Sequence, residues 1–218
     1  MTAGNGAPVK VFLPGWGFDA ALLDFAGLSG WWSPPGPVRG WPDAIDAQVG
    51  SAPGRRLLLA GWSLGAGVAL SYALAHPGRI DRLVLLALRR GWPPAELAAI
   101  RAGLAVDSAG FMTDFYRKCF AGQRGEWQRF KDGCMPALLA ALDPAALSQG
   151  LDVLAAAAMP AAVPLPPELR GRVVQLHGRR DLVAPLADIA ELPGVSPIIL
   201  PHAGHGLPFA DECRRLFV

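Results

Sequence analysis

One pentapeptide of this chain combines a nucleophilic hydroxyl group with the small residues that a sharp turn needs. Gly61-Trp62-Ser63-Leu64-Gly65 matches the pattern G-x-S-x-G. In this pattern the serine lies on a strained turn between a strand and a helix, and side chains at positions 61 and 65 would collide with neighbouring backbone. The N-terminus of the following helix also stabilises developing negative charge. We therefore predict that Ser63 is a nucleophile for acyl transfer, with an ordinary turn of small residues as the alternative.

A serine hydroxyl is a poor nucleophile at neutral pH and needs a base, which is most often histidine. Two of the four histidines, His202 and His205, lie in a loop after the last predicted strand, where they can fold back over the strand ends. His76 precedes a proline at a predicted helix end, and His177 ends a predicted strand, so structural roles suit both. The base is therefore expected to be His202 or His205.

An acid should hold the imidazole of that base in its useful tautomer. Asp181 lies at a turn that follows a predicted strand, and the order Ser63, Asp181, His205 is the order that α/β-hydrolases use. Asp188 is the alternative acid, although it falls in a helix-like stretch. The alternative for Asp181 is a turn residue without a catalytic role.

The tetrahedral intermediate of acyl transfer needs two backbone N–H groups that bind its oxyanion. Leu64, the residue after the nucleophile, is expected to supply one of them. Trp16 is expected to supply the other, from the glycine-rich loop 14–17 that follows the first predicted strand. The alternative for this loop is an ordinary turn at the end of a strand.

The elements around these residues form an alternating pattern of strands and helices. Apolar runs bounded by turn residues predict buried strands at 9–13, 56–61, 82–88, 172–177 and 197–200, and a weaker one at 38–41. Helices are predicted at 19–28, 43–49, 64–76, 188–191 and 211–217. A strand–helix–strand order implies parallel strands joined by a crossover helix. The expected fold class is therefore α/β, with a mostly parallel sheet flanked by helices.

The segment between the third and fourth predicted strands has no strand pattern. It contains four predicted helices, at 94–105, 111–120, 126–142 and 145–158, and a proline-rich return at 161–167. We therefore divide the chain into a core of residues 1–88 and 172–218 and a helical cap insertion of residues 89–171.

Composition and charge exclude several other classes of protein. Apolar residues make up 52% of the 218 residues and charged residues 17%, which is a globular balance. The net charge of +2, without a basic run, argues against nucleic-acid binding. Residues 1–10 lack the pattern of a signal peptide. Residues 57–75 carry no charge and are long enough to span a membrane, but the glycines around Ser63 favour a buried strand, turn and helix.

The three cysteines, which are odd in number and lack metal-like spacing, indicate free thiols in a reducing cytoplasm. We expect no metal site, no membrane segment and a cytoplasmic protein.

Four motifs and one cap segment resemble a known family. In order, they are GWGFD at 15–19, GWSLG at 61–65, GLDVL at 150–154, GRRDLVAP at 178–185 and AGHGLPF at 203–209. Together they resemble the pimeloyl-[acyl-carrier protein] methyl ester esterases of biotin synthesis. The tryptophans of the first two motifs are characteristic of that branch, whereas Pro14 stands where the family usually has histidine.

The resemblance implies a cytoplasmic carboxylesterase on the α/β-hydrolase fold that needs no cofactor. Its substrate would be the methyl ester of a pimeloyl chain carried on acyl-carrier protein. Site residues that the resemblance carries over are the triad of Ser63, Asp181 and His205, the oxyanion and substrate contacts Trp16 and Leu64, and the cap contacts Phe115 and Cys119. Nearby basic residues that could dock the acidic carrier are Arg117, Arg124 and Arg129, for which a solvated helix face is the alternative.

Two other functions remain open at this point. A general short-chain carboxylesterase or thioesterase could use the same triad, because fold and triad do not choose the substrate. A non-catalytic binding protein on the same fold is the second alternative.

Overall fold

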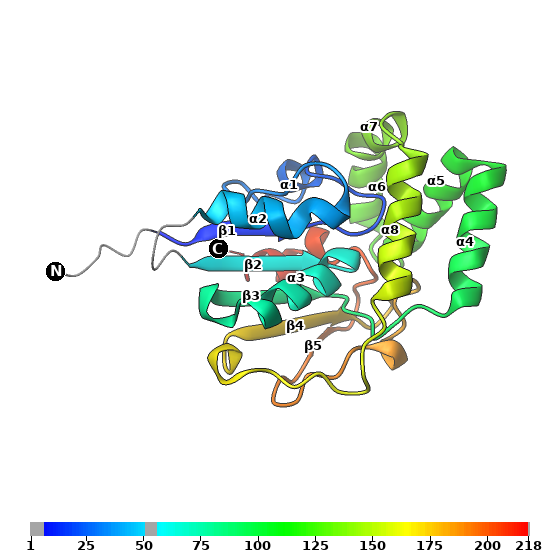
Figure 1. Ribbon diagram of the computed structural model, residues 1–218. Helices are drawn as coiled ribbons and strands as arrows, with labels where there is room; N and C mark the ends of the chain where they lie inside the picture. Colours follow the sequence, from blue (N-terminus) through cyan, green and yellow to red (C-terminus); the bar gives the residue numbers. More distant parts are fainter. Residues whose placement is uncertain (1–6, 51–55, 218) are drawn as a thin grey trace.

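A five-stranded parallel sheet forms the centre of the molecule. The computed structural model describes residues 7–50 and 56–217. The strands are β1 (Val9–Leu13), β2 (Leu57–Trp62), β3 (Ile80–Leu86), β4 (Val173–Gly178) and β5 (Ile198–Leu200), and they lie side by side in that order (Figure 1). Every neighbouring pair is parallel. The predicted fold class is confirmed, and the near-continuous apolar runs of β1, β2 and β3 suit strands that are covered on both faces.

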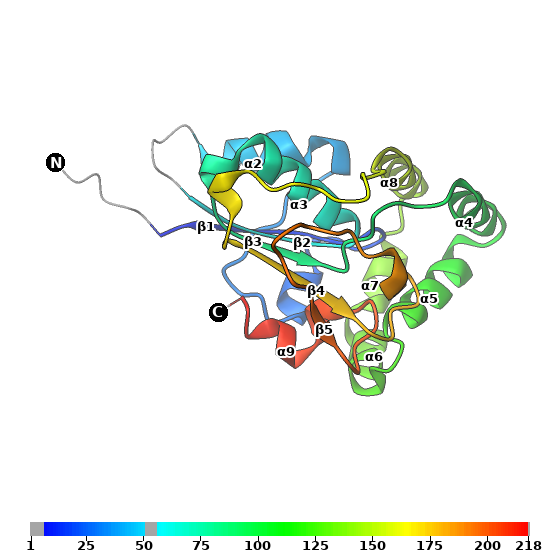
Figure 2. The same ribbon diagram turned by 90° about the horizontal axis from the view of Figure 1, so that it is seen from below.

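Helices cover both faces of this sheet. Figure 2 shows α2 (Trp41–Val49) and α3 (Leu64–Ala75) on one face and α9 (Asp211–Arg214) on the other. The four-residue helix α1 (Leu22–Phe25) lies on the same face as α9, where Phe25 contacts Phe209 at 5.8 Å between ring centroids. Helix α3 is the crossover between β2 and β3. It ends before Pro77, which cannot continue a helix.

Five helices lie together at the carboxyl ends of the strands (Figure 1). They are α4 (Pro94–Val106), α5 (Ser108–Cys119), α6 (Arg124–Gly133), α7 (Met135–Ala140) and α8 (Pro144–Ala156). Parallel strands all end at this edge of the sheet, so the loops after β1, β2, β4 and β5 meet beneath these helices. The division into a core and a cap insertion at 89–171 stays a prediction.

Two predicted elements of the core are wrong, and two predicted helices are shorter than expected. Residues 38–41 are not a strand, because the 3₁₀ helix η1 (Val38–Gly40) leads directly into α2, whose first turn takes Pro42. Residues 188–191 are not a helix; Ile189 and Glu191 instead form isolated bridges with other segments, after the 3₁₀ helix η4 (Leu186–Asp188). The terminal helix stops at Arg214, well before 217. The helix predicted at 19–28 exists only as the short α1.

The cap segment contains one helix more than the sequence predicts. The expected helix at 126–142 is broken between Gly133 and Met135, and α7 begins there with Pro136 in its first turn. Proline lacks the N–H that an uninterrupted helix needs, so the chain restarts the helix at this point. The remaining 3₁₀ helices are η2 (Pro77–Arg79), η3 (Pro167–Leu169) and η5 (Leu207–Phe209).

The membrane-span alternative for residues 57–75 is wrong. This stretch contains strand β2, a turn at Ser63 and helix α3. In the described part of the chain, every helix is too short or too polar to cross a bilayer. Residues 1–6, which make up most of the segment that lacks a signal-peptide pattern, lie outside the described residues.

Candidate active site

Ser63 lies at a sharp turn between β2 and α3. Its backbone has φ 56° and ψ −114°, in the left-handed region that residues other than glycine rarely adopt. The turn depends on its glycines, because a Cβ atom at Gly61 would collide with the backbone of Gly65, and one at Gly65 would collide with the carbonyl of Leu13. The strand and helix therefore approach closely enough to force the strained backbone, and strain of this kind concentrates at functional sites.

Asp181 and His205 form a buried hydrogen-bonded pair. The Nδ1 atom of His205 lies 2.7 Å from Oδ2 of Asp181, and both side chains are almost completely buried. The backbone N–H groups of Val183 and Ala184 donate to Oδ1 of Asp181 at 2.8 and 2.7 Å. Because a carboxylate accepts the Nδ1–H of His205, Nε2 is the ring nitrogen left free to accept a proton.

The environment of Asp181 favours its ionised form. Burial alone raises the pKa of this carboxyl, but the neighbouring His205 and the N–H of Ala184 outweigh it and hold the pKa below its ordinary value. Asp181 is therefore a carboxylate at neutral pH, as an acid that orients a histidine must be.

His177 supports the turn that holds Asp181. Its Nε2 atom lies 2.7 Å from the carbonyl oxygen of Ala184, and a carbonyl only accepts, so Nε2 carries the hydrogen. The Nδ1 atom is buried and has no hydrogen-bond partner among the described residues. Burial lowers the pKa of His177, which keeps the ring neutral beside Asp181.

Four hydrogen bonds, made by Trp62, Gln123 and Cys119, hold the loop that carries His205. The indole N–H of Trp62 donates to the carbonyl of His205 at 2.8 Å, which ties the nucleophile strand to this loop. Gln123, between α5 and α6, accepts from the N–H of Gly204 at 2.9 Å and donates to the carbonyl of Gly206 at 3.1 Å. The N–H of Gly206 also donates to the carbonyl of Cys119 at 2.7 Å. Sequence reasoning missed Gln123, because these contacts link positions more than 80 residues apart.

The loop after β1 lies beside the nucleophile. A Cβ atom added to Gly15 would contact the Cβ of Ser63 at 3.5 Å. The N–H groups of Trp16 and Leu64 have no acceptor among the described residues. The indole of Trp16 is buried and donates to the carbonyl of Leu147 in α8 at 2.9 Å. Two backbone donors are thus available near Ser63, as an oxyanion site requires.

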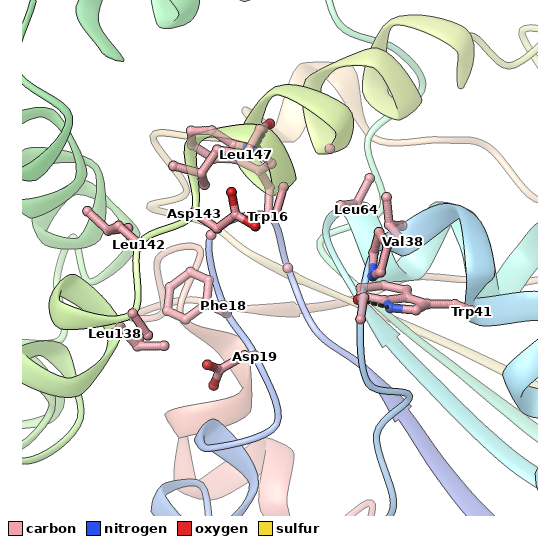
Figure 3. Close-up of a pocket in the computed structure, with 17 residues that line it drawn as sticks. Trp16, Phe18, Asp19, Val38, Trp41, Leu64, Leu138, Leu142, Asp143 and Leu147 are labelled. Carbon is pink, nitrogen blue, oxygen red and sulfur yellow. Dashed lines mark hydrogen bonds between the residues drawn. The ribbon is translucent and has the colours of Figure 1, made fainter. Parts of the chain in front are cut away.

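Two cavities meet at Leu64. The larger, of about 500 Å³, has Ser63 in its wall and runs between α3, η1 and the end of α8; we call it the α3 groove. The smaller, of about 160 Å³, lies on the Trp16 side (Figure 3). There the cap residues Leu138 and Leu142 face Leu64 across the space. Leu64 and Val38 line both cavities.

The remaining predicted site residues lie away from the α3 groove. Phe115 packs edge-on against Trp16, with ring centroids 5.0 Å apart, and Cys119 is completely buried; neither lines either cavity. Arg117 and Arg124 are exposed, and Arg117 pairs with Asp114 at 3.0 Å. Arg129 is exposed and lies over the ring of Phe25, at 5.9 Å from its centroid.

The two alternatives for the base and the acid lie elsewhere. His202 is exposed, whereas His205 faces Asp181. Asp188 binds Nη2 of Arg89 at 2.9 Å, in an ion-pair network that includes Glu96 of α4. The structure therefore brings together Asp181 and His205 and not their alternatives.

Comparison with known proteins identifies the family of this chain. A model of the alpha/beta hydrolase family matches residues 11–217. The chain belongs to this family. Together with the two relatives described next, this match confirms the predicted enzyme class, a carboxylic ester hydrolase, and the resemblance to the biotin-synthesis esterases. An esterase from Exiguobacterium antarcticum shares the fold, with a TM-score of 0.68 over 99% of this chain and 90% of that one, at 19% identity.

Two relatives carry a more specific name. A pimeloyl-[acyl-carrier protein] methyl ester esterase of Aromatoleum aromaticum is 32% identical over 172 residues, which is 69% of this chain and 66% of that protein. The esterase of the same name from Nitrosomonas europaea is 29% identical over 185 residues, which is 74% of this chain and 70% of that protein. The chain therefore spans about two thirds of the length of these relatives.

Proposed function

We propose that this hydrolase uses Ser63, His205 and Asp181 as a catalytic triad to cleave the methyl ester of a pimeloyl chain on acyl-carrier protein. Two observations carry the catalytic part: the buried 2.7 Å contact between His205 and Asp181, and the strained strand–helix turn at which Ser63 lies. The two esterases that are about 30% identical support the choice of substrate.

The reaction proceeds by acyl transfer through Ser63. Nε2 of His205 takes the proton of the Ser63 hydroxyl as its oxygen attacks the ester carbonyl, and the N–H groups of Trp16 and Leu64 bind the resulting oxyanion. His205 then gives the proton to the departing methanol. In the second half, His205 takes a proton from water as the water oxygen attacks the acyl-serine, and it returns that proton to the Ser63 oxygen as the free acid leaves. Asp181 stays ionised throughout and stabilises the imidazolium.

The docking of acyl-carrier protein on Arg117, Arg124 and Arg129 stays part of this proposal. These side chains lie on α5 and α6, at the carboxyl edge of the sheet, and all are exposed. A carrier protein is acidic, so exposed guanidinium groups would steer its approach. Phe115 and Cys119 are proposed to act on the substrate only indirectly, through Trp16 and the loop of His205. A cytoplasmic location fits this substrate.

Two experiments test the proposal. The purified protein is expected to release methanol from pimeloyl-[acyl-carrier protein] methyl ester, and Ser63→Ala to lose that activity by about 10⁴-fold or more. The gene is expected to restore growth without biotin to a strain that lacks its own esterase. Good activity on simple short-chain esters without either result would favour the general carboxylesterase or thioesterase. A failure of Ser63 to react with a fluorophosphonate probe would favour a non-catalytic binding protein.

A further inference from the structure

The α3 groove starts at the candidate nucleophile and follows one face of helix α3. Ser63, Gly67, Ser71 and Ala75 all line it, and they are spaced four residues apart. Residues at this spacing lie on one helix face, one turn after another. From Ser63 to Ala75 the helix rises about 18 Å, since each residue adds about 1.5 Å. The groove is therefore long and narrow, with Ser63 at one end.

The other walls of the groove are mainly apolar. Val153 and Leu154 contribute from the end of α8, Met159 from the chain that follows it, and Trp92 from the segment before α4. Apolar side chains on both sides suit a hydrocarbon chain, because contact removes apolar surface from water on the protein and on the chain. A round or strongly polar ligand would leave most of this length unused.

The two cavities that meet at Leu64 also differ in charge. None of the described residues in the wall of the α3 groove is acidic, and its two arginines, Arg39 and Arg89, each pair with carboxylates that lie outside the wall. Asp19 and Asp143 lie at the smaller cavity, which lacks basic side chains among its described lining residues (Figure 3). The two carboxylates thus make the smaller cavity the less favourable place for a hydrocarbon chain, because an apolar chain there would remove water from charged groups.

Gly67 keeps the groove open one turn away from Ser63. A Cβ atom at this position would have one heavy atom within 4 Å, Cε of Met159 at 3.9 Å. A glycine inside a helix costs about 1 kcal/mol relative to alanine, so its presence here is not explained by helix stability. What it provides is free space beside the nucleophile.

From these observations we infer that the acyl chain of the substrate lies in the α3 groove, with its carboxyl carbon at Ser63, and that Gly67 determines whether a long chain can enter. The small leaving alcohol then faces the smaller cavity across Leu64. This inference rests on the proposed function, because it assumes that Ser63 attacks an ester.

A series of leucine substitutions measures how long an acyl chain the groove accepts. The variants Gly67→Leu, Ser71→Leu and Ala75→Leu each place a side chain one turn farther from Ser63. They are compared with the wild type on p-nitrophenyl esters from acetate to dodecanoate. One turn of 5.4 Å corresponds to about four carbons of an extended chain. The longest ester that is hydrolysed efficiently is expected to shorten most in Gly67→Leu, less in Ser71→Leu and least in Ala75→Leu, with a loss of at least 10-fold beyond each limit.

Controls separate a blocked groove from a damaged fold. Each groove variant is judged by the ratio of its rate on a long ester to its own rate on the acetate ester, so a general loss of folded enzyme cancels. Gly67→Ala fills little space and is expected to raise the melting temperature. Gly78→Leu is the matched control, since Gly78 lies outside the groove, at a position where a Cβ would meet no heavy atom within 4 Å. This variant is expected to keep the wild-type chain-length profile.

Binding measured without turnover distinguishes this inference from the proposed function. Saturated fatty acids of four to twelve carbons are titrated into Ser63→Ala and into Ser63→Ala/Gly67→Leu by calorimetry. We expect affinity to rise with chain length in the first protein and to stop rising early in the second. Identical profiles in both proteins, or a uniform loss on all esters in Gly67→Leu, would overturn the groove assignment. The expected binding profiles without any ester hydrolysis would support the groove and reject the esterase.

Discussion

Replacing Asp181 by asparagine tests how the acid orients the base. Asparagine keeps the size of the side chain, and its carbonyl oxygen can still accept from the N–H groups of Val183 and Ala184. Its amide NH₂ then faces Nδ1 of His205, which lies 2.7 Å from Oδ2 in the wild type. Two donors cannot share a hydrogen bond, so His205 must move its hydrogen to Nε2. The nitrogen that should take the proton of Ser63 would then be a donor.

The expected result is a fall in kcat of about 10⁴-fold with little change in KM, because this loss is typical when an acid that orients a catalytic histidine becomes an amide. That fall corresponds to about 5.5 kcal/mol of transition-state stabilisation. The assay is steady-state hydrolysis of p-nitrophenyl butyrate, with circular dichroism to verify the fold. Asp188→Asn is the control, since Asp188 binds Arg89 and not His205, and it is expected to stay within about 3-fold of the wild type. An active Asp181→Asn protein beside an inactive Asp188→Asn protein would refute the assignment.

Three further predictions concern the supports of the site and its buried groups. Gln123→Leu removes both hydrogen bonds to the loop of His205. It should lower the free energy of unfolding by about 1–3 kcal/mol in urea titrations, and it should lower kcat more than it raises KM. An unchanged kcat would show that the loop needs no support from Gln123. Burial raises the pKa of Tyr72 to about 12, with a further contribution from Asp46, and raises the pKa of Tyr116 as well. Absorbance at 295 nm should therefore show much less tyrosine ionisation in the folded protein than in the unfolded chain at pH 10–11, and stability should fall as the pH rises above 10, because the unfolded chain loses these protons first. Burial likewise raises the pKa of all three thiols, so Ellman's reagent at pH 8 should react with them only after denaturation, and rapid reaction of the folded protein would contradict their burial.

The core and its chemical residues were the most predictable part of this protein. The strands are short apolar runs in one parallel sheet, and all but β5 are mainly buried, so the local sequence carries most of the information. The turn at Ser63 was predictable for the same reason, because Gly61 and Gly65 have no room for a side chain. Their steric requirement can be deduced from the motif alone.

The helices of residues 89–171 were harder to predict, because the residues at which they begin and end depend on single side chains. Helix α5 begins at Ser108 and not at 111, since Asp107 caps it by accepting from the N–H of Gly110 at 2.9 Å. Pro136 breaks the next helix. Both signals are local and could have been found in the sequence.

Long-range contacts account for what the sequence could not indicate. Gln123 is an ordinary polar residue in a turn, and its two bonds to the loop of His205 depend on how the cap packs on the core. The α3 groove is likewise formed by four separate segments of the chain. No pattern within one segment predicts such a cavity.

The most direct test of the central claim is to locate the covalent adduct of a fluorophosphonate probe by peptide mass spectrometry. We expect one modified residue, Ser63, in the wild-type protein, and no adduct in Ser63→Ala. The labelling rate should fall by at least 10³-fold in His205→Ala, because the hydroxyl then lacks its base. An adduct on another serine, or efficient ester hydrolysis by a protein that shows no adduct at Ser63, would contradict the account.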